Sequence, residues 1–194
     1  IGLQPCDLAK GCDSQKEWFE NLQSVWSEIY ELFKNEKMFL GIDSSVAPLF
    51  QGNSRFIHYI KKIHGSFNKS IVSESYIDVS GFIKKYNPKP VGLCRLMFPC
   101  LEDFELAEEY EKGLFTIERN IFLSLHSGLG IDTYPIGVDE SQSRILEILS
   151  LMKKLSDKYN KPLSVRFISD GSACIGKKSN FGNQYLRDVV IQKL

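Results

Sequence analysis

The chain has 194 residues, of which 43% are hydrophobic, and its equal numbers of acidic and basic residues give a formal net charge of zero. This length fits one domain with a sizeable core. Zero net charge argues against a dedicated nucleic-acid-binding protein, which needs a basic surface. No stretch reaches the ~18 consecutive apolar residues of a membrane span, and no signal peptide is visible. The five cysteines are therefore expected to be free thiols in the cytoplasm.

The first half of the chain is predicted to alternate helices with short strands. Residues 1–13 are expected to be irregular, and Asp13 and Ser14 are candidate N-caps for a helix over residues 15–35. Apolar residues in that helix recur every three or four positions, which is typical of a helix facing a core. The remaining elements predicted in this half are a buried strand at 38–42, helices at 55–64 and 75–86, and a strand at 91–98.

The second half continues the same alternation. The predicted elements are helices at 103–112, 116–126 and 139–159, strands at 129–133 and 163–168, and one more strand within 185–193. Strands that alternate with helices indicate an α/β fold with parallel strands and right-handed crossovers. Such strands form either an open doubly wound sheet or a segment of a larger α/β barrel. Because no linker is visible, residues 1–194 are expected to form a single domain.

One phrase occurs twice and carries most of the functional expectation. Leu-Gly-Ile-Asp appears at 40–43 and at 129–132, each time followed by a hydroxyl residue and then a proline. Each copy is interpreted as a short buried strand that ends in an aspartate. In parallel α/β folds, functional sites lie at the carboxyl ends of the strands. Asp43 and Asp132 are therefore candidate catalytic residues and candidate ligands for a divalent metal ion; the alternative is that each caps its own loop in an Asx-turn.

Three further positions extend this candidate site. Cys100 follows a predicted strand and precedes a helix, so it is a candidate catalytic thiol, although a buried structural cysteine is the commoner case. Asp139 is a candidate ligand-binding carboxylate, and its alternative role is the N-cap of the helix at 139–159. The glycine-bearing loop at 171–182 contains Lys177 and Lys178, which are candidate ligands for a phosphate or carboxylate.

Arginines lie within two predicted strands, Arg95 in the second and Arg166 in the fourth. A buried guanidinium group needs an acidic partner. Asp43 or Asp132 is expected to supply it from a neighbouring strand; the alternative is an edge strand whose arginine lies in solvent.

Four phrases resemble an uncharacterised family, the domain of unknown function seven hundred and eleven (uncharacterised protein family two-ten). They are Gly41-Ile42-Asp43-Ser44-Ser45-Val46-Ala47-Pro48, Leu96-Met97-Phe98-Pro99-Cys100-Leu101-Glu102-Asp103, Gly130-Ile131-Asp132-Thr133-Tyr134-Pro135, and the pair Lys161-Pro162-Leu163 and Gly176-Lys177-Lys178. The resemblance runs from about residue 38 to residue 185.

The resemblance implies a fold similar to the α/β barrel of pyruvate formate-lyase and other glycyl radical enzymes. It also implies members about twice this length, so the chain resembles the C-terminal half of such a barrel, with a partner half that is a lost segment or a separate chain. The family's Pro-Gly-Asp is replaced here by Gly137-Val138-Asp139. No Arg-Val-x-Gly-Tyr radical site is present, so glycyl radical chemistry is not expected.

Two functions follow as hypotheses. The first is an enzyme or small-molecule-binding protein with an acidic site at the strand ends, where Asp43, Asp132 and Asp139 face Lys177 and Lys178. A divalent metal ion is its candidate cofactor. The second is a non-catalytic structural or assembly subunit, favoured by zero net charge, abundant aromatic residues and open edge strands that need covering. Either way, the chain is expected to form an oligomer or to join a partner half-barrel.

Overall fold

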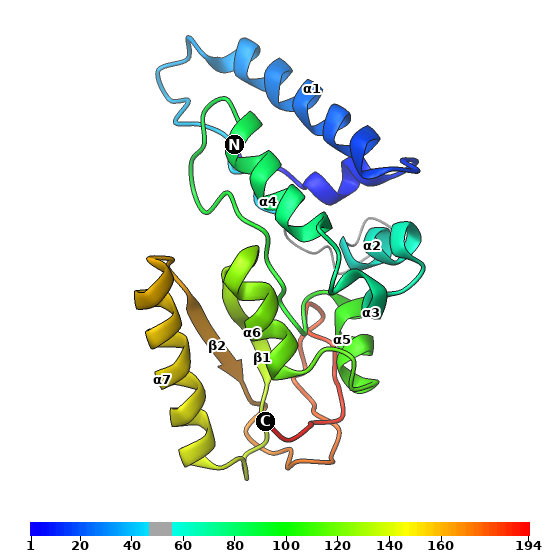
Figure 1. The fold of residues 1–194 in the computed structure, drawn as a ribbon, viewed down its shortest axis with the longest axis vertical. Helices are drawn as coiled ribbons and strands as arrows, with labels where there is room; N and C mark the ends of the chain where they lie inside the picture. The colour runs from blue at the N-terminus through cyan, green and yellow to red at the C-terminus, as the bar shows by residue number, and fades with distance from the viewer. Residues whose placement is uncertain (47–55) are drawn as a thin grey trace. The chain divides into compact units, whose positions relative to one another are not determined.

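The computed structural model describes residues 1–46 and 56–194 and divides the chain into two compact units, Ile1–Met97 and Phe98–Leu194 (Figure 1). Unit 1 and unit 2 below denote these ranges. Helices alternate with parallel extended segments, as the α/β prediction requires. The single-domain expectation for residues 1–194 stays a prediction. Among the described residues, no helix is long and apolar enough to cross a membrane.

Unit 1 consists mainly of helices. They are the 3-10 helix η1 (Pro5–Ala9) and the α-helices α1 (Gln15–Phe33), α2 (Phe56–His64), α3 (Phe67–Ser70) and α4 (Ser75–Tyr86). The predicted helices at 15–35 and 75–86 are confirmed, and the start of the predicted helix at 55–64 lies outside the described residues. The two short helices η1 and α3 were not predicted.

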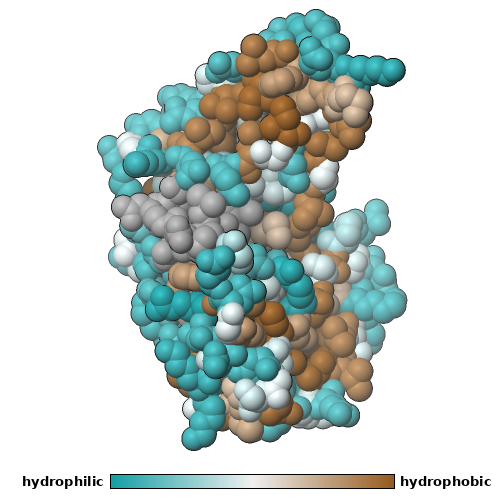
Figure 2. Space-filling model, turned by 180° about the vertical axis from the view of Figure 1, so that it is seen from behind, coloured by the Kyte–Doolittle hydropathy of each residue, from teal (hydrophilic) through white to brown (hydrophobic). Residues whose placement is uncertain are grey.

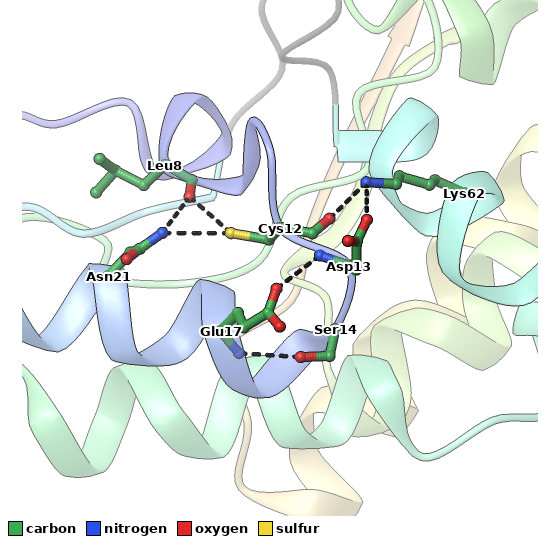
Figure 3. Close-up of polar contacts among 7 residues, drawn as sticks. All are labelled: Leu8, Cys12, Asp13, Ser14, Glu17, Asn21 and Lys62. Carbon is green, nitrogen blue, oxygen red and sulfur yellow. Dashed lines mark hydrogen bonds and ion pairs between the residues drawn. The ribbon is translucent and has the colours of Figure 1, made fainter.

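The start of α1 is fixed by a group of side chains around Ser14 (Figure 3). The Ser14 hydroxyl accepts a hydrogen bond from the Glu17 amide at 3.2 Å, and the Glu17 carboxylate accepts one from the Asp13 amide at 2.7 Å. This exchange resembles a capping box. Lys62 of α2 donates to the Asp13 carboxylate and to the Cys12 carbonyl, both at 2.7 Å, and thereby ties α2 to the start of α1.

Only part of the predicted apolar stripe of α1 reaches the core. Trp18, Leu22 and Trp26 are fully buried, whereas Leu32 is 67% exposed. Full burial of a leucine-sized side chain contributes about 1.5–3 kcal/mol, so the first three turns anchor the helix.

The predicted strands at 38–42 and 91–98 do not form regular strands. Single parallel bridges join Gly2 to Asp43, Ile42 to Pro90 and Val46 to Leu96. Gly92 and Cys94 have φ values of 76° and 45°, which interrupt the extended backbone.

Unit 2 contains α5 (Phe104–Glu111), α6 (Ile117–His126), strand β1 (Gly130–Pro135), α7 (Gln142–Tyr159) and strand β2 (Ser164–Ile168). β1 and β2 pair in parallel, and α7 connects them. The predicted strands at 129–133 and 163–168 and their parallel orientation are confirmed. The predicted strand within 185–193 is reduced to one antiparallel bridge between Lys178 and Val190.

Candidate functional site

Three charged side chains meet on the β1–β2 sheet of unit 2, and we call them the Arg166 cluster: Glu102, Asp132 and Arg166. The Arg166 Nε atom donates to Asp132 Oδ1 at 2.5 Å, and its Nη2 atom donates to Glu102 Oε1 at 2.9 Å. The side chains of Arg166, Glu102 and Asp132 are 56%, 34% and 14% exposed. Of the two acids proposed as partners for a strand arginine, Asp132 pairs with Arg166 across neighbouring strands, and the arginine is also open to solvent, as the alternative held.

The backbone holds the two carboxylates in place. The Cys100 amide donates to the Asp132 carbonyl at 2.9 Å, and a parallel bridge joins Pro99 to Asp132. Asp103 then caps α5 by accepting hydrogen bonds from the Glu105 and Leu106 amides. Glu102 lies between this bridge and this cap, so its Cα position is fixed on both sides.

Asp132 does not end its strand, contrary to expectation, because β1 continues to Pro135 through an irregularity. The register with β2 shifts between Ile131 and Tyr134. Thr133 has φ 39° in this segment, which is unfavourable for a β-branched residue. Its side chain is buried, and its hydroxyl has no hydrogen-bond partner among the described residues. A strained residue with an unsatisfied polar group therefore directly follows Asp132.

Electrostatics within the cluster follow from burial and proximity. Burial raises the pKa of Glu102, the nearby Asp132 carboxylate raises it further, and Arg166 opposes both effects. Burial works against the positive charge of Arg166, but Asp132 and Glu102 together raise the pKa of the guanidinium group. The arginine is therefore a fixed positive charge beside a carboxyl group, Glu102, whose pKa is raised.

Cys100 lies next to the cluster in sequence, and its side chain is completely buried. Burial raises the pKa of this thiol well above its ordinary value, and Asp103 adds to the effect. A thiol in this environment is protonated at neutral pH and is a poor nucleophile. The catalytic role of Cys100 stays a prediction, and its observed contribution is the amide that binds Asp132.

Asp43 lies in unit 1 and caps its own loop. Its Oδ1 atom accepts hydrogen bonds from the Ser45 amide at 3.0 Å, the Ser45 hydroxyl at 2.6 Å and the Cys94 amide at 3.3 Å. Although burial opposes the charge, these hydrogen bonds lower the pKa of Asp43. Gly92 is required here, because a Cβ at that position would lie 2.4 Å from Asp43 Oδ2. The structure thus shows the Asx-turn that was the alternative to a functional site.

Asp139 also has a structural contact, and it does not cap the long helix. The N-cap of α7 is Ser141, which accepts from the Arg144 amide, so the predicted helix start at residue 139 is wrong by three residues. The Asp139 carboxylate instead accepts from the Ile175 amide at 2.8 Å. That bond, with one from the Val138 amide to the Ala173 carbonyl, ties the segment before α7 to the following loop.

The loop with Lys177 and Lys178 is organised by an aspartate that sequence reasoning missed. The Asp170 carboxylate accepts hydrogen bonds from the Ser172, Ala173 and Asn180 amides, which lower its pKa to about 2. Lys177 and Lys178 are exposed, and among the described residues neither forms an ion pair. Their ligand-binding role stays a prediction.

Glu102 is the other residue that sequence reasoning missed, although it belongs to the phrase Leu-Glu-Asp that follows a predicted strand end. No group of three or more histidine, cysteine, aspartate or glutamate side chains in residues 1–46 and 56–194 is arranged to hold a metal ion. A metal site on Asp43 and Asp132 stays a prediction.

Comparison with known proteins adds one finding. No curated protein and no solved structure matches the chain. Residues 20–181, however, match the model of the family described as Uncharacterised ACR (DUF711), which covers the two Leu-Gly-Ile-Asp phrases and all three residues of the Arg166 cluster. The chain therefore belongs to the DUF711 family of uncharacterised proteins.

Proposed function

We propose that the chain binds a small polar molecule at the Arg166 cluster and that Glu102 exchanges a proton with it. One observation carries this proposal: Asp132, which pairs with the solvent-accessible Arg166, directly precedes Thr133, a strained, buried residue whose hydroxyl has no hydrogen-bond partner among the described residues. Strained backbone and unsatisfied polar groups concentrate at functional sites. In the corresponding segment of unit 1, Asp43 Oδ1 instead accepts from the Ser45 and Cys94 amides.

The charges favour a particular ligand chemistry. Two carboxylates surround one guanidinium group, which leaves one net negative charge. Both carboxylates already accept from Arg166, and their remaining lone pairs are free to accept further hydrogen bonds. The cluster is therefore suited to a hydroxyl or ammonium group of a small molecule.

The chemistry proposed for the cluster is general acid–base catalysis. A carboxyl group whose pKa is raised lies closer to neutrality and exchanges a proton more effectively at physiological pH. Arg166 orients Glu102 through its 2.9 Å hydrogen bond, and Asp132 holds Arg166 from the other side.

The finer parts of the sequence hypothesis remain proposals. The parallel bridges in each unit support a place in a larger α/β barrel, like that of glycyl radical enzymes. A divalent metal ion at Asp43 and Asp132 would add a Lewis acid to the acidic site. A cytoplasmic location is likewise a proposal from the sequence.

The test compares two matched glutamates by thermal shift. Glu108 pairs with Arg187 at 3.5 Å and is 38% exposed, close to the 34% of Glu102. Wild-type protein is screened against sugars, polyols and alkylamines, and against Mg²⁺ and Mn²⁺. A ligand at one hundred times its Kd stabilises by about 2.7 kcal/mol. We expect Glu102→Gln to abolish that shift and Glu108→Gln to retain it; equal shifts in both variants would contradict the proposal.

An assembly role is the second candidate, favoured by uncovered surface in unit 2. Among the described residues, β2 has β1 as its one strand neighbour. Ile148 and Met152 of α7 are buried, whereas Leu146 and Leu151 are 62% and 44% exposed. Apolar surface is also visible in both units in Figure 2. Analytical ultracentrifugation tests this role, and a monomer at all concentrations would contradict it.

A further inference from the structure

We propose that the groove between α1 and α4 binds the exposed face of α7 from a second copy of the chain. This inference builds on the assembly role and not on the Arg166 cluster. Its two surfaces lie on different units of the chain, so each is described by itself.

The groove in unit 1 has an aromatic floor. α1 and α4 lie side by side in Figure 1, and the space along them has a volume of ≈ 540 Å³. Phe19 of α1 stacks on Phe82 of α4, with ring centroids 4.2 Å apart and planes 10° apart, and Tyr86 lies 4.6 Å from Phe82. All three rings are only partly buried. They offer flat apolar surface to a partner.

The rim of the same groove is acidic. Asp78 of α4 and Glu74, which precedes α4, line it on one side, and Glu20 lines it from α1. All three are exposed, and Glu74 and Asp78 form no ion pair among the described residues. Among the described residues, Lys16 is the one basic residue that lines the groove, and it pairs with Glu20 at 3.7 Å. The groove therefore favours a partner with apolar side chains flanked by positive charge.

The exposed face of α7 has this composition. We define the α7 stripe as Leu146, Leu151, Lys154 and Lys158. The last three recur at spacings of three and four residues, and Leu146, Leu151 and Lys154 line one surface hollow of α7. Glu147 also lines this hollow and pairs with Arg144 at 3.4 Å. All four side chains are exposed, and the two leucines are the apolar part. The last two turns of α7 contain three lysines and one aspartate, so they are basic. The stripe thus supplies leucines for the aromatic floor and lysines for the acidic rim.

The geometry of such a contact is head to tail. The groove and the stripe are different surfaces, so each copy would use its groove for one neighbour and its stripe for another. Heterologous contacts of this kind produce rings or open chains. The contact is also expected to weaken as ionic strength rises, because rim charges are screened.

The test uses two charge-reversal variants of the full chain in sedimentation velocity. Glu74→Lys with Asp78→Lys alters the groove, and Lys154→Glu with Lys158→Glu alters the stripe. Each variant alone is expected to lose association by about tenfold or more in Kd, because like charges then face each other. The groove variant keeps an unaltered stripe, and the stripe variant keeps an unaltered groove. When the two variants are mixed, these unaltered surfaces can bind each other. The mixture should therefore form a complex with twice the 22.2 kDa mass of one chain.

Controls separate the possible failures. Glu28→Lys with Glu36→Lys changes the same amount of charge in unit 1 outside the groove and should leave association unchanged; circular dichroism confirms folding of every variant. A monomeric wild type would overturn both this inference and the assembly role. Association that survives both reversals, or a folded mixture that stays monomeric, would overturn this inference alone and leave the β2 edge as the assembly surface.

Discussion

The two copies of Leu-Gly-Ile-Asp adopt the same local arrangement up to the aspartate. Gly41 and Gly130 both have positive φ values, 152° and 130°. A Cβ on either would collide with a backbone carbonyl of the adjacent parallel segment. The isoleucine that follows each glycine, Ile42 or Ile131, is completely buried. In each copy, the glycine therefore allows two backbone segments to approach closely, and the isoleucine supplies one core residue.

The copies differ from the aspartate onward. Asp43 accepts hydrogen bonds from its own loop and the Cys94 amide, and the next residue, Ser44, is buried and accepts from Asn87 Nδ2 at 2.8 Å. Asp132 binds the Arg166 side chain, and the hydroxyl of the next residue, Thr133, has no partner among the described residues. The buried hydroxyl that follows the aspartate is therefore hydrogen-bonded in unit 1, whereas the one in unit 2 has no partner among the described residues.

The difference shows that the neighbouring segment decides the role of each aspartate. A glycine beside Asp43 permits backbone amides to approach the carboxylate, whereas an arginine beside Asp132 supplies a charged partner. Identical short phrases thus predict backbone geometry better than they predict chemistry.

The largest expected effect tests the shared part of the phrase. Gly130→Ala and Gly41→Ala would place Cβ atoms 2.0 Å from the Ser164 carbonyl oxygen and 2.4 Å from that of Lys89. Overlap with backbone adds to the strain of a positive φ, so we expect each to lower the free energy of unfolding by about 3 kcal/mol or more. Urea denaturation followed by circular dichroism measures it.

Gly171→Ala is the matched control, since Gly171 has φ 79° and a Cβ added there would meet open space. It should cost about 1–2 kcal/mol through strain alone. If Gly130→Ala lowers the free energy of unfolding no more than Gly171→Ala does, the repeated glycine does not serve to let two backbone segments approach closely.

The second prediction separates the two hydroxyl residues. Ser44→Ala removes the acceptor for a buried Asn87 amide and should destabilise by about 1–3 kcal/mol. Thr133→Val replaces an unpaired hydroxyl by a methyl group of the same shape, so it should be neutral or stabilise by up to about 1–2 kcal/mol. Chemical denaturation measures both, and a clear loss of stability in Thr133→Val would mean that its hydroxyl has a partner in solution.

The third prediction compares the two arginines. Arg166→Met leaves Asp132, whose side chain is 14% exposed, without its charged partner, and we expect a loss of about 1–2 kcal/mol. Arg95 is exposed, so Arg95→Met should change stability by less than about 0.5 kcal/mol. Thermal unfolding checks this pair, and equal losses would indicate that the Arg166 cluster contributes nothing specific to unit 2.

Much of the secondary structure was predictable, because strong local signals encode it. The Ser14 cap of α1, the bounds of α4 and the end of α7 at Tyr159 agree with the structure. The strand predicted at 38–42 was wrong, because hydrophobicity suggested a buried strand whereas Met38 and Leu40 are 87% and 76% exposed. Apolar runs alone do not show whether a partner segment covers them.

The candidate site was predictable only in part. The need of a buried strand arginine for an acid pointed to Asp43 or Asp132, and the structure pairs Arg166 with Asp132 although the arginine is 56% exposed. Glu102 was not predicted, because it comes from a turn 30 residues before Asp132 and its Leu-Glu-Asp phrase does not show that the turn meets Arg166. The Asp170 contacts were missed for the same reason, since its amide partners span a loop of ten residues.

The smallest effect is a difference in pH dependence between Asp43 and Glu102. The pKa of Asp43 is lowered by its hydrogen bonds, so its contribution to stability is present above its unfolded pKa and is lost as pH falls through the folded value. The pKa of Glu102 is raised, so the folded state holds a proton more tightly and stability falls as pH rises from the unfolded pKa through the folded value. The two residues therefore affect stability in opposite directions.

Stability curves between pH 3 and pH 7 for single variants test this opposition. Asp43→Asn should flatten the loss of stability on acidification, and Glu102→Gln should remove a loss that accompanies rising pH. Glu108→Gln serves as the control for charge removal in unit 2, because Glu108 is as exposed as Glu102. Should both variants change the curve in the same direction, the Asp132 carboxylate and burial do not raise the pKa of Glu102, and the argument for proton exchange at the Arg166 cluster loses its electrostatic basis.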